Sequence, residues 1–293
     1  MNTSRRVALV TCATFPDLWD DDHLLRDALR ERGVIVEAVR WDDETADWSG
    51  YDLAVIRSTW DYVARHEQFV TWARRVPRLL NPADVIAWNT DKVYLRDLAE
   101  AGVPTIPTEF VAPGQTWSPP ADGEWVVKPT VSAGSQDTGR YHLPADLPLA
   151  QAHVERLGAA GRTTMIQPYL TAVDTAGETA VLCTPDAAGE LTYSHAIRKG
   201  PMLSGPAADS NIDPGSEDIT PRTPSPAELE TAAKVLAAIP GGTGNLLYAR
   251  VDLIPGPDGT PTLIELELTE PSLFFTEGPG SAARLADAIL RRL

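Results

Sequence analysis

Two stretches near the C-terminus decide the fold: YARVDL at residues 248–253 and LIELEL at residues 263–268. Polar and apolar residues alternate in both, which predicts two strands, and the Pro-Asp-Gly turn between them predicts a hairpin. Because side chains at every second position share a face, Arg250 and Asp252 lie together, and Glu265 and Glu267 do the same.

Pairing of these two strands would place three carboxylates in one patch. Carboxylates at short range repel one another unless cations neutralise them. An exposed polar sheet face is the alternative, but such faces more often mix charges with threonines. Oxygen ligands favour Mg²⁺, so the pattern predicts a magnesium site formed by Asp252, Glu265 and Glu267.

The rest of the chain alternates short apolar runs with helical patterns. In the first ninety residues this alternation indicates a parallel sheet in an α/β domain. Strands are predicted at 7–10, 34–39, 53–56, 125–128, 164–167, 178–183, 193–198, 246–254 and 262–268. Helices are predicted at 23–32, 67–76, 91–101, within 144–161, at 226–239 and at 281–293. Residues 200–226 are rich in Gly, Pro, Ser and Asp and predict a long loop.

The composition excludes several classes of function. The chain has 293 residues, with 41 acidic against 25 basic and a net charge of −16, which argues against binding to nucleic acid or to an anionic membrane. No apolar run reaches the roughly 18 residues of a membrane span. Two cysteines are too few for a disulfide framework. Arg5-Arg6 before an apolar run faintly resembles an export signal, but Pro16 and several acids end that run, so we expect a buried strand in a cytoplasmic protein.

Lysine is rare, with only Lys92, Lys128, Lys199 and Lys234 among the 25 basic residues. Lys92 begins a predicted helix, where the helix dipole disfavours a cation unless an anion binds there. Lys128 ends an apolar strand and needs an anionic partner. The loop 132–139 after it has small side chains, so its backbone N–H groups could approach phosphate oxygens. A solvated lysine and an ordinary loop are the alternatives.

No Walker A or G-x-G-x-x-G pattern occurs, yet these pieces, in this order and spacing, resemble the ATP-grasp ligases of the glutathione synthetase and D-alanine–D-alanine ligase kind. The resemblance covers the chain from about residue 80 onward. It implies an α/β (α+β) architecture in which an N-terminal parallel-sheet domain (1–88) precedes two α+β subdomains (89–168 and 169–293) that clasp ATP.

The resemblance also implies a nucleotide site. Lysines meet the phosphates, a flexible flap covers them, an interdomain linker meets the adenine, and one acid, either Glu178 or Asp174, holds the ribose. The implied ATP-binding residues are Lys92, Lys128, Ser132, Ala133, Gly134, Ser135, Gln167, Pro168, Tyr169, Leu170, Asp174 and Glu178.

The family's metal motif, R-x-D…E-x-N, has glutamate at Glu267 where asparagine is usual. This leaves open how Glu265 and Glu267 share two Mg²⁺ ions. Arg250 and Arg198 are implied to act on the reacting phosphoryl or acyl group. The polar residues implied to face a small amino-acid-like substrate are Ser58, Thr59, Trp60, Asp61, Lys199, Glu270 and Ser272.

The implied chemistry is transfer of the ATP γ-phosphoryl group to a carboxylate, followed by attack of a nitrogen nucleophile. The strings RSTWDY, NTDK, HAIRK, YARVDL and LELTEPS most resemble the cyclo-ligases of D-cycloserine biosynthesis. This implies ring closure of O-ureido-D-serine. An intermolecular amino-acid or peptide ligase and a nonenzymatic nucleotide-binding regulator are the alternatives. Dimers are common among the resembling enzymes, although the sequence does not fix the oligomeric state.

Overall fold

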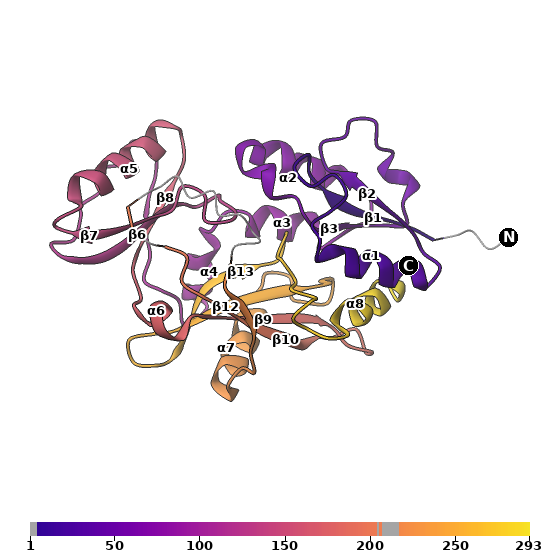
Figure 1. Cartoon of the computed structure of the whole chain (residues 1–293). Helices are drawn as coiled ribbons and strands as arrows, with labels where there is room; N and C mark the ends of the chain where they lie inside the picture. The colour runs from indigo at the N-terminus through magenta and orange to yellow at the C-terminus, as the bar shows by residue number, and fades with distance from the viewer. Residues whose placement is uncertain (1–4, 204, 207–216) are drawn as a thin grey trace.

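The described residues form three β-sheets that surround a common centre, with helices on their outer faces (Figure 1). This computed structural model describes residues 5–203, 205–206 and 217–293. Part of the loop predicted at 200–226, namely 204 and 207–216, lies outside the described residues. No helix in the described ranges is long and apolar enough to cross a membrane.

The first sheet is parallel, as predicted, with the order β2-β1-β3-β4. Its central strand is buried from Val7 to Val10, because helices cover both faces. The strands are β1 (Arg6–Thr11), β2 (Ile35–Arg40), β3 (Leu53–Ile56) and β4 (Leu79–Leu80). The helices are α1 (Asp22–Glu31), α2 (His66–Arg75) and α3 (Ala83–Asn89), with 3₁₀ turns η1 (Trp48–Gly50) and η2 (Trp60–Arg65).

The second sheet is antiparallel, with the order β5-β8-β6-β7. Helix α5 (Leu147–Ala159) packs against it, and α4 (Tyr94–Glu100) leads into it from the first domain. Its strands are β5 (Glu109–Val111), β6 (Gly123–Pro129), β7 (Gly139–Leu143) and β8 (Thr164–Pro168). Only β6 and β8 were predicted from the sequence, since β5 has three residues and β7 directly follows the small-residue loop predicted at 132–139.

The third sheet is also antiparallel, with the order β11-β10-β9-β12-β13. Its strands are β9 (Glu178–Pro185), β10 (Leu191–Lys199), β11 (Ile219–Pro221), β12 (Ala249–Pro255) and β13 (Pro261–Glu267). Its helices are α6 (Ala172–Ala176), α7 (Pro226–Ala237) and α8 (Ser281–Leu290). Each sheet falls within one of the three ranges predicted as domains or subdomains, 1–88, 89–168 and 169–293. That each range forms a domain of its own stays a prediction.

The first and third sheets share a hydrophobic core. Leu25 and Leu29 of α1 belong to the same buried cluster as Leu285 and Ile289 of α8, and Figure 1 shows α8 returning beside α1. The C-terminal helix therefore fixes the third sheet against the N-terminal domain.

Two buried asparagines strengthen this junction. The Asn81 amide donates to the carbonyl oxygens of Tyr248 and Leu268, at 3.0 and 2.6 Å, and accepts from the Leu247 N–H. Asn89 donates to the Leu266 carbonyl at 2.7 Å and accepts from the Leu268 N–H. These bonds satisfy backbone groups where β12 begins and β13 ends, and they hold the polar face of both strands toward the centre of the molecule.

The helix predicted from residue 91 instead begins at Tyr94. Lys92 lies in the turn between α3 and α4, where the Asp91 carboxylate accepts from the Val93 N–H. The argument that a helix dipole acts on Lys92 is therefore corrected: the short α4 starts two residues later, and the fold places Lys92 by other contacts.

Candidate active site

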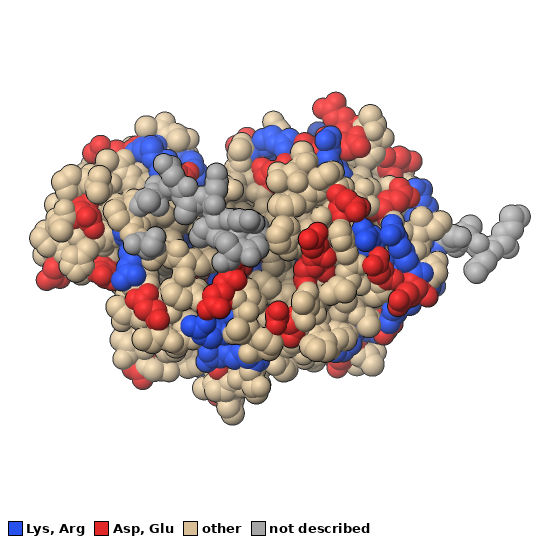
Figure 2. Space-filling view, in the orientation of Figure 1, with Lys and Arg blue, Asp and Glu red and all other residues tan. Residues whose placement is uncertain are grey.

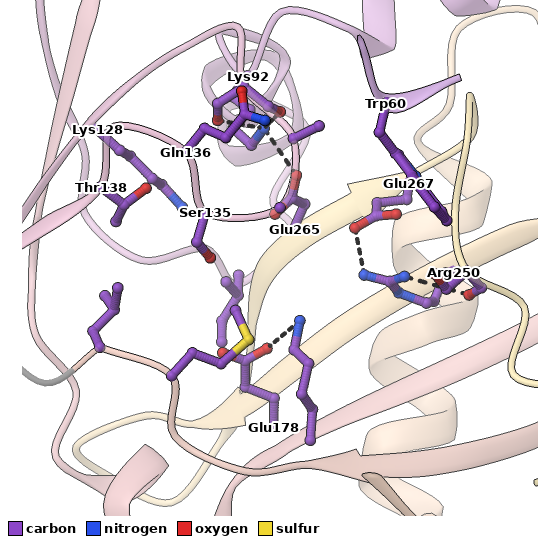
Figure 3. A pocket seen from close by; sticks show the side chains of 18 of the residues that line it. Trp60, Lys92, Lys128, Ser135, Gln136, Thr138, Glu178, Arg250, Glu265 and Glu267 are labelled. Carbon is purple, nitrogen blue, oxygen red and sulfur yellow. Dashed lines mark hydrogen bonds and ion pairs between the residues drawn. The ribbon is translucent and has the colours of Figure 1, made fainter. Parts of the chain in front are cut away.

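A cavity of about 420 Å³ opens where the three sheets meet. Its walls come from the ends of β1 and β3, from the loop after β6, from the β8–α6 linker and from the polar face of β12 and β13. Figure 3 shows Lys92, Lys128, Glu178, Arg250, Glu265 and Glu267 pointing into it. On the face shown in Figure 2, acidic and basic side chains are spread over the surface. In the cavity, side chains of both charges line one small space.

Arg250 and Asp252 are placed by the hairpin as predicted. Strands β12 and β13 pair so that Arg250 faces Glu267 and Asp252 faces Glu265. The Arg250 Nε donates to Asp252 at 2.9 Å, and its Nη2 also contacts Glu267. Burial opposes the charge of Arg250, but Asp252 and Glu267 raise its pKa well above the usual value. The guanidinium thus stays charged at the cavity wall.

Three lysines of the chain line the cavity. Lys92 Nζ lies 3.0 Å from Glu265 and 2.7 Å from the Ser132 carbonyl. Lys199 Nζ lies 3.3 Å from Glu178, and together with Asp252 this carboxylate outweighs the burial penalty and raises the lysine pKa. These two lysines are already neutralised by the protein.

Lys128 differs, because no described carboxylate lies within ion-pair distance of its Nζ. Burial lowers its pKa, and the charge of Lys92 adds to this effect. Its neighbour is the predicted flap, where Ser132, Ala133, Gly134 and Ser135 line the cavity. Lys128 is half-buried, and a partly desolvated, unneutralised ammonium favours an anionic ligand, as the predicted phosphate-binding position would require.

The opposite side of the cavity carries two glutamates whose charges are unequally compensated by the protein's cations. Burial raises the pKa of Glu267 to about 8, because Arg250 only partly offsets burial and the charges of Glu265 and Asp252. Glu265 behaves in the opposite way: burial is outweighed by Lys92 and Lys128, and its pKa falls to about 2. The sheet face thus contains one carboxyl group, that of Glu267, whose charge the protein's own cations do not fully compensate.

The predicted cluster of three metal-ligating carboxylates does not form. Among the residues that the structure describes, no three Asp, Glu, His or Cys side chains are close enough to hold one ion. Asp252 is 1% exposed, does not line the cavity and lies against Arg250. Glu265 and Glu267 do line it. Their carboxylate oxygens and the surplus charge fit Mg²⁺, which takes few protein ligands and completes its shell with phosphate and water.

The adenine-binding prediction falls on residues of the cavity wall. Gln167, Pro168, Tyr169 and Leu170 all line it, and the Gln167 amide donates to Thr108 Oγ1 at 2.9 Å. Of the two acids proposed for the ribose, Glu178 lines the cavity. Asp174 does not, because its carboxylate accepts from the Tyr169 hydroxyl at 2.6 Å on the outer side of the linker.

Two residues predicted to contact substrate lie outside the cavity wall. Ser58 and Thr59 are fully buried and do not line the cavity, because Ser58 Oγ donates to Asp22 at 2.7 Å and accepts from the Trp19 N–H. Trp60 and Asp61, which follow them, do line it. In the segment after β3, Ser58 and Thr59 therefore pack in the N-terminal core, whereas Trp60 and Asp61 of η2 reach the cavity.

Arg198, predicted to act on the reacting group, also lies outside the cavity wall. Its guanidinium donates to the Ala176 carbonyl at 3.0 Å and pairs with Asp218 at 3.1 Å, away from the cavity. Lys199, the next residue of β10, points inward instead because adjacent side chains leave opposite faces of a strand. Glu270 and Ser272 line the cavity, and their contact with substrate stays a prediction.

Several cavity residues were not predicted from the sequence. Cys12, Thr14 and Phe15 follow β1, and Tyr62 lies in η2. The available signal was their place just after parallel strands, where α/β sheets bind ligands. The same rule holds for the segments after β1 and β3, although ligand contacts were predicted only for the segment after β3.

Known proteins resemble the chain over nearly its whole length. Residues 7–81 match the family model of the D-cycloserine synthetase DcsG N-terminal domain. The cycloserine biosynthesis protein DcsG of Streptomyces lavendulae is 38% identical over 303 residues, covering 98% of both chains. The crystal structure of D-cycloserine synthetase DcsG superposes with a TM-score of 0.85 at 37% identity, covering 98% of this chain and 99% of that one.

A more distant structure extends the likeness in fold. The D-alanine–D-alanine ligase of Bacillus anthracis, complexed with ATP, has a TM-score of 0.64 at 14% identity over 99% of this chain and 97% of that one. The predicted fold is confirmed, and the enzyme is an ATP-dependent ligase. This chain belongs to the DcsG family of ATP-grasp ligases.

Proposed function

We propose that this enzyme closes O-ureido-D-serine into D-cycloserine, using ATP and two Mg²⁺ ions. The observation that carries the proposal is the 38% identity to DcsG across 98% of both chains. The cavity supports it, because cations that suit phosphates and carboxylates that suit a metal and an amino acid line the same space.

The reaction needs three balanced events. The ATP γ-phosphoryl group moves to the substrate carboxylate, which gives ADP and an acyl phosphate. The substrate's own nitrogen bonded to oxygen then attacks the acyl carbon, and phosphate leaves as the ring closes. D-cycloserine lacks the carbamoyl group of the substrate, so addition of one water must release that group as carbon dioxide and ammonia.

The protein's own groups would bind and orient the reactants. Lys92 and Lys128 would meet the ATP phosphates, and Arg250 would stabilise charge at the reacting carboxyl group. Glu265 and Glu267 would hold magnesium, which supplies charge neutralisation between the phosphates. Asp252 would fix the Arg250 guanidinium, since two of its oxygen contacts hold Nε and Nη2.

The test is a reaction that contains the enzyme, ATP, magnesium and one amino acid at a time. With O-ureido-D-serine we expect release of ADP and phosphate and a product with the mass of D-cycloserine. A product that joins two substrate molecules would instead support an intermolecular ligase. Tight ATP binding without phosphate release for any amino acid would support the regulator and overturn the proposal.

A further inference from the structure

Glu270 is distinguished from the other acids of the cavity by its neighbours. Glu178, Glu265 and Glu267 each lie within ion-pair distance of a lysine or arginine. Glu217 acts electrostatically on Lys199 and Arg250. Glu270 lines the cavity, yet no described cation lies within ion-pair distance of its carboxylate.

The partner that Glu270 does have is a tyrosine. Tyr62, 2% exposed, lies close enough to Glu270 to lower the pKa of its carboxyl group as a hydrogen-bond partner, and both side chains line the cavity. Burial raises the pKa of Glu270 to about 7, although Tyr62 and the charge of Lys92 oppose this. A carboxylate desolvated in this way gains most from a cationic ligand.

The backbone around Glu270 is held unusually firmly for a loop. Three consecutive carbonyl oxygens accept hydrogen bonds from buried or half-buried side chains. Thr269 accepts from the Tyr248 hydroxyl at 2.9 Å, Glu270 from Trp60 Nε1 at 2.9 Å, and Pro271 from Arg57 Nη2 at 2.7 Å. Such support fixes the carboxylate before substrate arrives, which reduces the entropy lost on binding.

The other carboxylate at this end of the cavity is not free to receive a cation. Asp61 accepts from Trp41 Nε1 at 2.7 Å with one oxygen and pairs with Arg65 at 3.0 Å with the other. Both of its oxygens therefore serve contacts within the N-terminal domain. Phe15 and Trp60, whose ring centroids are 5.3 Å apart, supply apolar wall beside it.

An amino-acid substrate brings one cation, its α-ammonium group, and this group needs an acceptor away from the phosphates. We propose that the Glu270 carboxylate binds the α-ammonium group of the substrate and that Tyr62 holds this carboxylate in position. The inference rests on the proposed function, since it takes an amino acid as the substrate. It makes Glu270 the residue that selects an amino acid over a plain carboxylic acid.

The test compares O-ureido-D-serine with its analogue in which hydrogen replaces the α-amino group. Binding is followed by tryptophan fluorescence, because Trp60 lines the cavity, so the measurement does not depend on turnover. The wild-type enzyme should bind the amino acid at least thirty-fold more tightly than the analogue, as expected for loss of one partner of a buried charged pair. Glu270→Gln should bind both equally.

Two further variants separate recognition from folding. Tyr62→Phe keeps the carboxylate and should reduce the preference for the amino acid several-fold, while Glu100→Gln, an exposed position on α4, should not change it. The KM for ATP and the magnesium dependence should stay within about two-fold of wild type in Glu270→Gln, since a neutral amide keeps the local shape.

The inference is overturned if Glu270→Gln retains the wild-type preference for the ammonium group, or if it changes only the magnesium dependence, which would assign Glu270 to the metal. If Glu270→Gln does not fold, an unchanged preference in Tyr62→Phe is sufficient to overturn it. Absence of phosphate release from the wild type with every amino acid would count against the proposed function instead, because the binding comparison is independent of that readout.

Discussion

Replacing Arg57 with methionine should lower the free energy of unfolding by about 3–5 kcal/mol, the usual cost of breaking a buried ion pair. Arg57 is 1% exposed, and its Nε lies 2.7 Å from Asp22, which is itself buried. Its Nη2 donates to the Pro271 carbonyl at 2.7 Å. Methionine fills similar volume but leaves the Asp22 charge without a cation and the carbonyl without this donor.

A second change isolates the electrostatic part of this loss. In the double variant Arg57→Met with Asp22→Asn, no charge is left unpaired, and the amide still accepts from Ser58 Oγ, which lies 2.7 Å from Asp22. We expect the double variant to recover about 1 kcal/mol or more relative to Arg57→Met, since an unpaired buried charge carries most of the penalty.

Arg96→Met is the matched control. Arg96 is 58% exposed in its side chain and lies 3.8 Å from Asp97, so its loss should change stability by no more than about 0.5 kcal/mol. Urea unfolding followed by circular dichroism measures all four proteins under one set of conditions. A loss below about 1 kcal/mol in Arg57→Met, or a double variant less stable than the single one, would refute the assignment of a stabilising buried ion pair between Arg57 and Asp22 inside the N-terminal domain.

Two other predictions concern single titratable groups. Lys128→Met should weaken ATP binding at least ten-fold by calorimetry. The unliganded protein should become no less stable, because Lys128 is half-buried without an ion-pair partner and its removal ends a desolvation penalty; a clear loss of stability would contradict this. Burial lowers the pKa of His153 to about 4, so between pH 6.5 and 4 the unfolded state binds more protons and stability falls as the pH falls, by about 2 kcal/mol between pH 8 and pH 5. His153→Gln should remove that part of the pH dependence in urea unfolding, and an unchanged slope would argue against a neutral buried histidine.

The strand pleat explains why the hairpin could be predicted well from the sequence. Alternation in YARVDL and LIELEL requires only local geometry, and the register that pairs Arg250 with Glu267 follows the predicted faces. The same logic could not place Arg198. Strand alternation puts Arg198 and Lys199 on opposite faces of β10, but which face turns to the cavity depends on how β10 packs between β9 and β11, which local sequence does not encode.

Burial by tertiary contacts accounts for the other differences. Ser58 and Thr59 are polar, and their place after a strand is typical of ligand-binding residues, yet their surroundings include Asp22 from a helix 36 residues earlier. Asn81 and Asn89 show the converse, because short polar side chains with no motif of their own satisfy backbone groups of β12 and β13. Long-range hydrogen bonds of this kind depend on the packed sheets and are not encoded in local periodicity.

Three of the four lysines and several of the acidic residues line the same cavity. A buried ion pair gains little net stability over apolar residues of the same size, so the ionic network around Arg250 and Lys199 is better explained by ligand binding than by folding. Lys128 and Glu267 lie on opposite sides of the cavity in Figure 3, and neither is fully neutralised by the protein. One side of the cavity therefore suits anions and the other suits cations. This arrangement fits ligands of both charges, with phosphate anions at the lysine side and metal and ammonium cations at the glutamate side.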